Sequence, residues 1–295
     1  MIAFNRYYNK FNILSITLVV ISLLFLVFKG LNFGIDFKGG TLIELRSTDS
    51  NINVSSLRDN LNQMNLGDVS VKNFGNETDF LIKFENSNNK NVIEEIKINL
   101  DKSFGNNFDF RRVENVGPKV SAELLRSGII AITVALVLML IYIWIRFEWQ
   151  FSLGAILALF HDVIVTLGLF SLLGLEINLS IIAAVLTIVG YSMNDTVVIF
   201  DRVRQNLSKY SDIKIYELTN ISINETLSRT LITSITTLLA LFSIFFFGGE
   251  ILKGFSLAMI FGVIFGTYSS IYIANTVLVR LKVSQKTVLR EDDKN

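Results

Sequence analysis

The 295-residue sequence contains no cysteine, one histidine and one proline, and only 18% of its residues are charged. Without cysteine the chain forms no disulfide and offers no thiolate to a metal, and a single histidine excludes a site built from a histidine cluster. With so little proline, long helices run without interruption. The net charge of +1 gives no support for a nucleic-acid partner. No feature of the composition calls for a cofactor.

Hydrophobic residues make up 51% of the chain, and many of them gather in six long apolar stretches. A membrane-spanning helix needs about 20 mostly apolar residues to cross ~30 Å of hydrocarbon. The sequence therefore predicts an α-helical polytopic membrane protein with six transmembrane helices. The expected spans are residues 13–28, 128–145, 151–173, 179–200, 227–247 and 255–279.

The first apolar stretch is short, and it can be read as a cleavable signal peptide. No small-residue cleavage pattern follows it, because the chain continues with Lys29–Phe33. Tyr7, Tyr8 and Phe11 precede the stretch and are suited to anchor it at the membrane interface. We therefore expect an uncleaved first span.

Lysine and arginine in the short connections predict the orientation of the spans. They form two sets of unequal size: 13 on one side of the membrane, and only Lys253 on the other. Positive residues accumulate on the cytoplasmic side, so both termini are expected in the cytoplasm and the long segment 30–127 outside it. The larger set comprises Arg6 and Lys10 of the N-terminus, Arg146 of the turn at 146–150, Arg202, Arg204, Lys209, Lys214 and Arg229 of the expected loop 201–229, and Arg280, Lys282, Lys286, Arg290 and Lys294 of the tail.

Segment 30–127 has the pattern of a folded α+β domain. Apolar residues recur with the period of a strand in four places and with the period of a helix in two. The order β-α-β-β-α-β is that of a ferredoxin-like split βαβ sandwich. No catalytic cluster is visible, so we expect a surface for protein contact or a rigid lever. The expected strands are Thr41–Arg46, Asp68–Phe74, Asp79–Phe84 and Phe108–Val113, the expected helices are Val54–Met64 and Asn91–Phe104, and a turn is expected at Gly75 and Asn76.

Four segments follow from these patterns. Residues 1–29 are the N-terminus and first transmembrane helix, and residues 30–127 are the extramembrane domain. Residues 128–279 form a bundle of five further transmembrane helices, and residues 280–295 form a cytoplasmic tail.

Ionisable residues inside the spans are the candidates for function, because each costs at least ~2.5–3.5 kcal/mol at a helix centre unless it is sheltered. His161 and Asp162 lie near the middle of the third span. Asn194 and Asp195 lie about two turns before the cytoplasmic end of the fourth. The fifth span begins with Arg229 and continues with several threonines and a serine.

Asp195 and Arg229 are predicted to lie at a similar depth, because the fourth span runs inward and the fifth starts inside. A carboxyl group beside an arginine is ionised. If the arginine moves away while the group stays buried from water, the carboxylate takes up a proton. The pair is therefore a candidate proton-driven switch. Helical spacing places each residue on a polar stripe: Thr187, Tyr191, Asp195 and Arg202 on the fourth span, and Arg229, Thr233 and Thr237 on the fifth.

Each of these features also has a purely structural interpretation. An Asp–Arg pair between helices can be a buried clamp. His161 and Asp162 can simply hydrogen-bond to neighbouring helices, and the threonine and serine stripe can hold helices together. Gly190 can serve close packing. Spacing alone leaves these alternatives open.

Five stretches resemble, in order and position, the motifs of the SecD/SecF family of protein-export membrane proteins. Val189–Arg204 resembles the fourth-span signature of the SecF subunits. Phe33–Thr41 resembles the motif after the first span, and Val116–Ser121 the motif that enters the second. His161–Val163 and Leu227–Thr230 match the third and fifth spans. The resemblance covers nearly the whole chain, and the combination of motifs is specific.

Nine residues stand out within these motifs. The pairs Gly39-Gly40 and Gly117-Pro118 flank the extramembrane domain and are candidate hinges. The motif residues are Gly34, Asp36, Gly39 and Gly40 after the first span, Gly117 and Pro118 before the second, and Gly190, Asp201 and Arg202 in the fourth-span signature.

The resemblance implies a half-molecule of the RND transporter superfamily that pairs with SecD in the lipid of the bacterial inner membrane, with segment 30–127 in the periplasm. It implies that the pair assists the SecYEG channel and the SecA motor, with YajC as a further partner. The proton-motive force would then promote a late stage of export of unfolded polypeptide. Asp195 falls on the family's membrane-embedded proton-site aspartate and Arg229 on its fifth-span arginine. Gln205 departs from the glutamate common in relatives, which leaves the cytoplasmic contact at this position open.

Two other classes of protein are alternatives. An RND-type small-molecule or lipid exporter subunit is the first, but six spans and one modest domain make only half of such a machine. An intramembrane aspartyl protease, with Asp162 and Asp195 as its dyad, is the second. Such enzymes place a Gly-x-Gly run before the second acid, whereas this chain has Tyr191–Asn194. No Ser–His pairing on adjacent spans suggests acyl chemistry, so we do not expect an enzyme.

Overall fold

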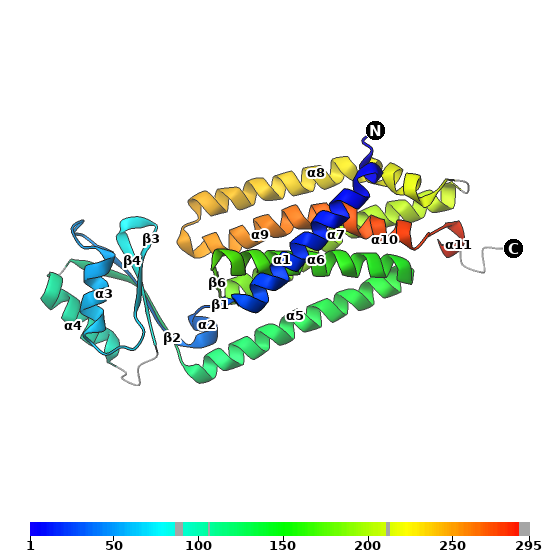
Figure 1. Cartoon of the computed structure of the whole chain (residues 1–295). Helices are drawn as coiled ribbons and strands as arrows, with labels where there is room; N and C mark the ends of the chain where they lie inside the picture. The colour runs from blue at the N-terminus through cyan, green and yellow to red at the C-terminus, as the bar shows by residue number, and fades with distance from the viewer. Residues whose placement is uncertain (86–90, 106, 211–212, 289–295) are drawn as a thin grey trace. The chain divides into compact units, whose positions relative to one another are not determined.

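The computed structural model describes residues 1–85, 91–105, 107–210 and 213–288. The chain divides into two compact units, one formed by residues 1–32 together with the chain from 130 onward, the other by residues 33–129. Arg290 and Lys294 of the expected tail lie outside the described residues. The helices and strands of both units are labelled in Figure 1.

Six helical stretches in the described part of the chain are long and apolar enough to cross a membrane, and each contains one of the predicted spans. This confirms a multi-pass membrane protein. The helices are α1 (Tyr8–Phe28), preceded by η1 (Phe4–Tyr7), α5 (Pro118–Arg146), α6 (Trp149–Leu173), α7 (Leu179–Lys209) and α8 (Ile215–Phe247), and the sixth span consists of α9 (Glu250–Ser269), the π-helix η2 (Ser270–Ala274) and α10 (Asn275–Arg280). The short β6 (Glu176–Ile177) lies between α6 and α7, and α11 (Gln285–Val288) follows the sixth span.

The connection between the fourth and fifth spans is shorter than predicted. Residues 201–229 are expected as a loop, but α7 continues to Lys209 and α8 starts at Ile215. Hydropathy marks where a helix leaves the hydrocarbon, and its backbone hydrogen bonds continue into water wherever the sequence permits. Here the polar C-terminal part of α7 and the polar N-terminal part of α8 are hydrogen-bonded to each other, because Asn206 donates a hydrogen bond of 2.6 Å to Glu225.

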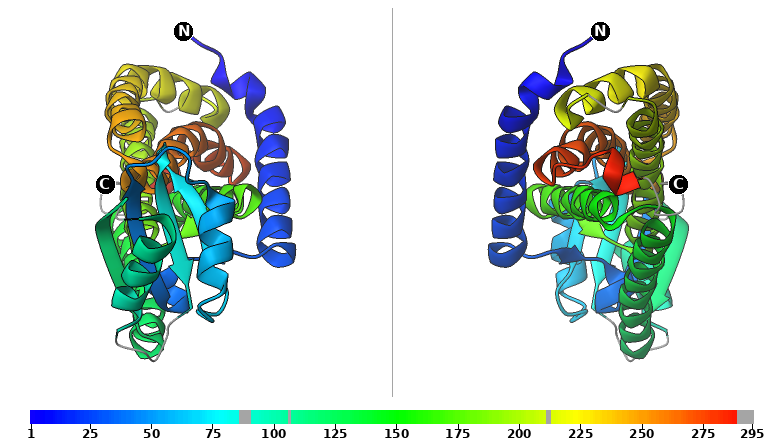
Figure 2. Two further views of the ribbon diagram at one scale, coloured as in Figure 1. Left: turned by 90° about the vertical axis from the view of Figure 1, so that its left-hand side faces the viewer. Right: turned by 90° about the vertical axis from the view of Figure 1, so that its right-hand side faces the viewer.

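The centre of the bundle is formed by α6, α7 and the sixth span. Half or more of their apolar windows is buried, against 11% for α1 and α5 and 17% for α8. Both views of Figure 2 show α1, in blue, at the side of the bundle. The peripheral helices therefore leave most of their surface to lipid or to other chains.

Glycines let some of these helices approach closely. A Cβ atom added to Gly168 on α6 would lie 2.2 Å from Cβ of Ser22 on α1, and one added to Gly262 on α9 would lie 2.2 Å from Cγ1 of Ile188 on α7. Gly190 on α7 is different, because outside its own helical turn no atom of the described chain lies within 4 Å of the same position. The interpretation of Gly190 as a close-packing residue is therefore wrong within this chain, since the glycine lies on an open surface.

The second unit has the predicted order β-α-β-β-α-β. Its strands pair in the order β3-β4-β2-β5, antiparallel throughout, and α3 and α4 cover one face of the sheet (Figure 1). The helices bury Leu57, Leu61, Ile96 and Leu100 against the sheet. The elements are β2 (Gly40–Ser47), α3 (Val54–Asn62), β3 (Ser70–Phe74), β4 (Asn76–Phe84), α4 (Val92–Phe104) and β5 (Phe108–Val116), preceded by β1 (Asn32–Phe33) and α2 (Ile35–Lys38).

The double glycine of the first motif stands at the start of β2, in a place that excludes side chains. Gly39 and Gly40 have φ angles of 79° and 131°, which L residues rarely adopt. A Cβ atom on Gly40 would lie 2.7 Å from the backbone oxygen of Phe84 on the neighbouring strand. Only glycine fits here without displacing β4.

The two candidate hinges lie next to each other. A Cβ atom on Gly39 would lie 3.3 Å from the backbone oxygen of Val116 and 3.5 Å from Cα of Pro118. Gly40 is also the register partner of Val116 in the sheet. The chain thus enters and leaves this unit at one point, while the hinge role of the two pairs stays a prediction.

An ion pair on the sheet joins β2 to β4. Arg46 and Asp79 are register partners, and Nη2 of Arg46 donates a hydrogen bond of 2.6 Å to Oδ2 of Asp79. A second hydrogen bond runs from Nε of Arg46 to Oδ1 of the same carboxylate. These hydrogen bonds from the guanidinium lower the pKa of Asp79.

A carboxyl whose pKa is lower in the folded than in the unfolded chain stabilises the fold above its unfolded pKa of about 3.9, and the contribution is lost as the pH falls through the folded-state value. We expect Asp79→Asn to speed hydrogen exchange of the β2 and β4 amides at pH 7, and the difference from the wild-type protein to shrink below about pH 4. Asp101→Asn, on the exposed side of α4, is the control. A difference that stays constant with pH would contradict the assignment.

Candidate functional site

Asp162 lies fully buried in the centre of the bundle. Its Oδ2 atom accepts hydrogen bonds from Oγ of Ser192 on α7, at 2.5 Å, and from Oγ of Ser269 on α9, at 2.7 Å. Nδ1 of His161 lies 2.9 Å from its Oδ1 atom. Buried polar groups need such partners, because an unpaired one costs its full desolvation energy. Asp162 therefore joins the three central helices at one point.

Asp195 belongs to a separate chain of hydroxyl groups. Oγ1 of Thr267 on α9 donates a hydrogen bond of 3.4 Å to Oδ2 of Asp195. Thr267 lies 2.8 Å from Oγ of Ser234 on α8, and the hydroxyl of Tyr191 donates to Ser234 at 3.5 Å. Asp195 is 3% exposed, yet it has only this one weak hydrogen bond within the described chain. Its carboxyl is thus buried and sparsely stabilised.

Arg229 does not touch Asp195 in the described part of the chain. The arginine lies exposed on α8, and it acts on the carboxylate electrostatically, without a hydrogen bond or ion pair. The structure therefore answers the question that spacing left open: the two residues face the same region, but they are not in contact.

Asn194 points away from Asp195, although the two are adjacent in sequence. It is exposed, as are Ala183, Thr187 and Gly190 on the same helix. The intervals of four, three and four residues place these side chains on one face, which we call the open face of α7. Small and polar residues are typical of contacts between transmembrane helices, whereas lipid is usually met by large apolar side chains. The open face therefore has the composition of an interface.

Asp201 and Arg202 of the fourth-span signature belong to a network at the C-terminal end of α7. Nη2 of Arg146 donates to Asp201 at 2.9 Å, and Nε of Arg202 donates to Glu225 at 2.7 Å. Gln205 connects the two pairs, because its amide donates to Asp201 at 2.8 Å and accepts from Arg202 at 3.0 Å. Glutamate cannot make the first of these bonds when ionised. Gln205, which replaces the glutamate common in relatives, therefore contacts both Asp201 and Arg202. The network connects α5, α7 and α8.

Sequence reasoning found the acids and missed their partners. His161 and Asp162 do lie together, and Tyr191, on the predicted stripe with Asp195, contacts Ser234 of the fifth span. The hydroxyl partners carried a signal of their own: Ser269 begins a polar pair in an apolar span, and Ser192 lies three residues before Asp195. Helical spacing on a single span does not tell which neighbouring helix supplies a partner.

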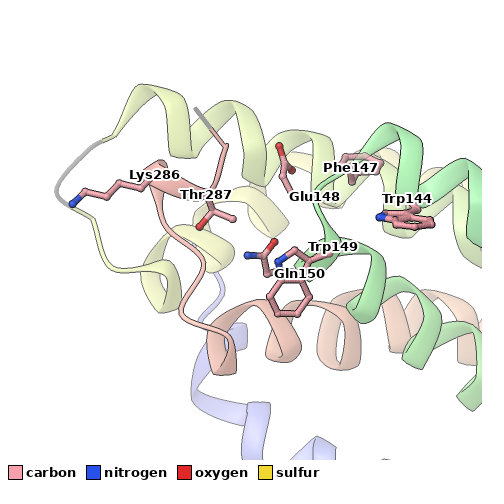
Figure 3. Close-up of a pocket in the computed structure, with 7 residues that line it drawn as sticks. All are labelled: Trp144, Phe147, Glu148, Trp149, Gln150, Lys286 and Thr287. Atoms are coloured by element: carbon pink, nitrogen blue, oxygen red, sulfur yellow. The ribbon is translucent and has the colours of Figure 1, made fainter. Parts of the chain in front are cut away.

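A hollow in the surface lies apart from these residues (Figure 3). It has a volume of about 520 Å³ and lies at the turn between α5 and α6. Neither Asp162 nor Asp195 lines this hollow. The lining residues are Trp144, Phe147, Glu148, Trp149, Gln150, Lys286 and Thr287.

The fold and the site define a six-span membrane protein that has a split βαβ unit after its first span and a polar centre inside its bundle. Residues 96–284 match the family model for the protein export membrane protein SecD/SecF, C-terminal, and residues 24–50 match the SecD/SecF GG motif. The chain belongs to the SecD/SecF family of protein-export membrane proteins.

Its relatives place it on the SecF side of this family. Protein translocase subunit SecF of Rickettsia bellii (strain OSU 85-389) is 48% identical over 267 residues, which cover 90% of this chain and 88% of the relative. The same subunit of Rickettsia felis is 46% identical over 282 residues, with 94% and 91% covered. The resemblance inferred from the motifs is thereby confirmed.

The fold is also that of solved relatives. The crystal structure of SecDF, a translocon-associated membrane protein from Thermus thermophilus, matches with a TM-score of 0.86 and 37% identity over 95% of this chain. A structure of SecDF in a super-membrane-facing form matches with a TM-score of 0.71 and 36% identity over 95% of this chain. This chain spans 38% of the length of the first SecDF chain and 39% of the second.

Proposed function

We propose that this chain pairs with a SecD subunit in the bacterial inner membrane and that the pair uses the proton-motive force to promote a late stage of protein export. The observation that carries the proposal is the arrangement of α7, with a buried and sparsely bonded Asp195 next to an open face of small and polar residues. The SecDF chains, of which this chain covers little more than a third, support a second membrane half as the partner of that face.

Asp195 is the group that exchanges the proton in this proposal. Burial penalises an ionised carboxylate unless cations or donors compensate for the lost water. Among the described residues only Thr267 donates to it, and Arg229 acts from a distance. A proton that reaches Asp195 replaces a charge held by these two groups with a neutral carboxyl. The loss of that charge changes how α7, α8 and α9 hold each other.

The extramembrane unit of residues 33–129 is the part that responds. The chain enters and leaves this unit at the neighbouring pairs Gly39-Gly40 and Gly117-Pro118, and we propose that a change in the bundle is passed to the unit through them. We propose that the unit lies in the periplasm, where it grips and releases unfolded polypeptide that SecA drives through the SecYEG channel, with YajC as a further subunit. The basic residues of the connections support cytoplasmic termini.

The structure gives no support to an aspartyl protease or to a small-molecule or lipid exporter. Asp162 and Asp195 belong to separate hydrogen-bond chains in the described residues, so they do not form the dyad of an aspartyl protease, and we propose no catalytic activity. Export of small molecules or lipids by this chain has no observation in its favour, and the family to which it belongs points to protein as the cargo.

Co-purification tests the partnership. An affinity-tagged copy of the chain is expressed in its own membrane, extracted in mild detergent and purified in one step. We expect a second six-span protein in stoichiometric amount and the export channel in a smaller amount. An unrelated tagged six-span protein is the control for chance association. Recovery of the chain alone, or only with copies of itself, would contradict the proposed pairing.

A further inference from the structure

The fully buried side chains of α1 all carry a polar group. The four buried residues among its 21 are Tyr8, Asn12, Ser15 and Ser22. Their intervals of four, three and seven residues place them on one face, which we call the polar seam of α1. Most apolar residues of the helix are exposed, as Ile13 is with 67% of its surface, while Phe11 packs against Tyr272 of the sixth span. Polar groups inside a bilayer are costly and are most often found where they have a function.

The seam leads to the centre of the bundle through Tyr268 on α9. Oγ of Ser15 lies 2.7 Å from the hydroxyl of Tyr268, and this hydroxyl donates a hydrogen bond of 2.7 Å to the backbone oxygen of Phe11. The ring of Tyr268 lies against the imidazole of His161, with ring centroids 5.9 Å apart. The seam therefore ends next to His161.

The other end of the seam lies at the start of α1. The hydroxyl of Tyr8 donates a hydrogen bond of 3.1 Å to Thr219 on α8. From Tyr8, ring contacts continue to Tyr272, with centroids 6.4 Å apart, and from there to Tyr268, with centroids 5.4 Å apart. A continuous row of polar and aromatic side chains thus connects the N-terminal end of α1 with the middle of the bundle.

The two ring nitrogens of His161 differ in their surroundings. Nδ1 lies 2.9 Å from Asp162, whereas Nε2 is buried and has no hydrogen-bond partner in the described chain. Nδ2 of Asn12 on α1 and Oγ1 of Thr166 on α6 are also buried without a partner. Three unpaired polar atoms on two helices that pack together are unusual in a protein interior. Imidazole can accept a proton at one nitrogen and release one at the other near neutral pH.

We propose that the polar seam of α1 and His161 form a proton relay that ends at Asp162. A proton that enters from water along the seam binds Nε2 of His161, and the proton on Nδ1 passes to Oδ1 of Asp162, where an O–H bond forms. One N–H bond forms and another breaks, so the imidazole is neutral again, with its proton on Nε2, and the carboxylate has become a carboxyl. This relay rests on the proposed proton-coupled function, and it is distinct from the chain that contains Asp195.

Protonation of Asp162 affects the contacts that hold the central helices. A neutral carboxyl is a weaker acceptor than a carboxylate, so the hydrogen bonds from Ser192 and Ser269 weaken. Ser192 precedes Asp195 by one helical turn, and Ser269 is followed directly by the π-helix η2, a type of segment often found at functional sites. In the described chain the titratable groups next to His161 are Asp162 on its own helix and Tyr268 on α9, while α1 and α7 contribute the hydroxyls of Ser15 and Ser192.

Proton flux through the purified complex tests the relay. The complex of this chain with its partner is placed in proteoliposomes with a pH-sensitive dye inside, and a proton gradient is applied. His161→Gln keeps an amide donor for Asp162 but carries no proton, and we expect it to lower the flux at least about tenfold. Asn12→Leu and Ser15→Ala interrupt the seam without touching His161, and we expect each to lower the flux several-fold. Ser256→Ala removes a buried hydroxyl of α9 whose hydrogen bonds among the described residues stay within its own helix, and serves as the control.

The outcomes separate the relay from the proposed function. If His161→Gln and both seam variants keep the flux of the wild-type complex while Asp195→Asn abolishes it, the relay is refuted and the proposed function stands. If Asp195→Asn also leaves the flux unchanged, both fail. A flux that falls in the seam variants, with assembly and thermal stability unchanged, supports the relay even where His161→Gln impairs folding.

Discussion

Asp195→Asn is expected to remove the whole of the proton-driven part of export and to leave the complex assembled. Asparagine has the size of aspartate and keeps an oxygen that accepts the hydrogen bond from Thr267, but its amide does not take up a proton. Export into inverted membrane vesicles, measured with and without a proton gradient, checks this. The rate with the gradient is expected to fall to the rate without it.

Two variants make this result specific. Asp201→Asn changes the same chemical group on the same helix, but it lies in the network with Arg146 at the end of α7, and we expect export to stay proton-dependent. Thr267→Val removes the hydroxyl donor to Asp195 and is expected to reduce the gradient-dependent rate without abolishing it. Full stimulation by the gradient in the Asp195→Asn complex would show that this carboxyl does not couple proton flow to export.

Leucine at Gly190 is expected to separate the partner subunit from a chain that is itself still folded. Outside its own helical turn, no atom of the described chain lies within 4 Å of a Cβ atom at Gly190, so the position has room for a larger side chain. The new side chain projects from the open face of α7, where small residues let another helix approach. We expect loss of most of the partner in pull-down experiments and an unchanged thermal midpoint for the isolated chain.

Gly168→Leu is the matched variant with the opposite expectation. The added Cβ atom would lie 2.2 Å from Cβ and 2.7 Å from Cα of Ser22, so α1 is pushed away from α6. Overpacking of this kind costs typically about 1–3 kcal/mol, and more where backbone must move. The thermal midpoint of the isolated chain should fall clearly. If Gly190→Leu retains its partner at the wild-type level, the open face of α7 is not the interface.

The spans could be predicted from sequence because the width of the hydrocarbon sets a minimum length for every apolar stretch. The ends of the helices could not. A helix can continue beyond the hydrocarbon as polar turns in water. For this reason α5 begins at Pro118, ten residues before the apolar stretch, and α7 extends to Lys209. The four strands and two longer helices of the extramembrane unit were predicted in the right order, because alternation and helical spacing differ clearly in a soluble α+β fold, whereas β1 and α2 were not predicted and β4 begins at Asn76, within the predicted turn.

The candidate site was only partly predictable. The cost of burying charge identifies Asp162, Asp195 and His161 without any structure. Which acid is fully bonded and which is not depends on hydroxyls from other helices, and a single sequence does not say that Ser269 reaches Asp162 or that Arg229 stands apart from Asp195. The polar seam of α1 has a helical period in the sequence, but a search for apolar stretches counts composition and overlooks the face on which four polar residues lie.

The account depends most directly on the claim that Asp195 gains and loses a proton while the complex works. Infrared difference spectroscopy of the reconstituted complex, recorded as the external pH is lowered, detects the C=O band of a newly protonated carboxyl group. We expect a band that is absent in Asp195→Asn and present in Asp201→Asn. An identical band in the wild-type and Asp195→Asn complexes, or no carboxyl band in either, would contradict the account.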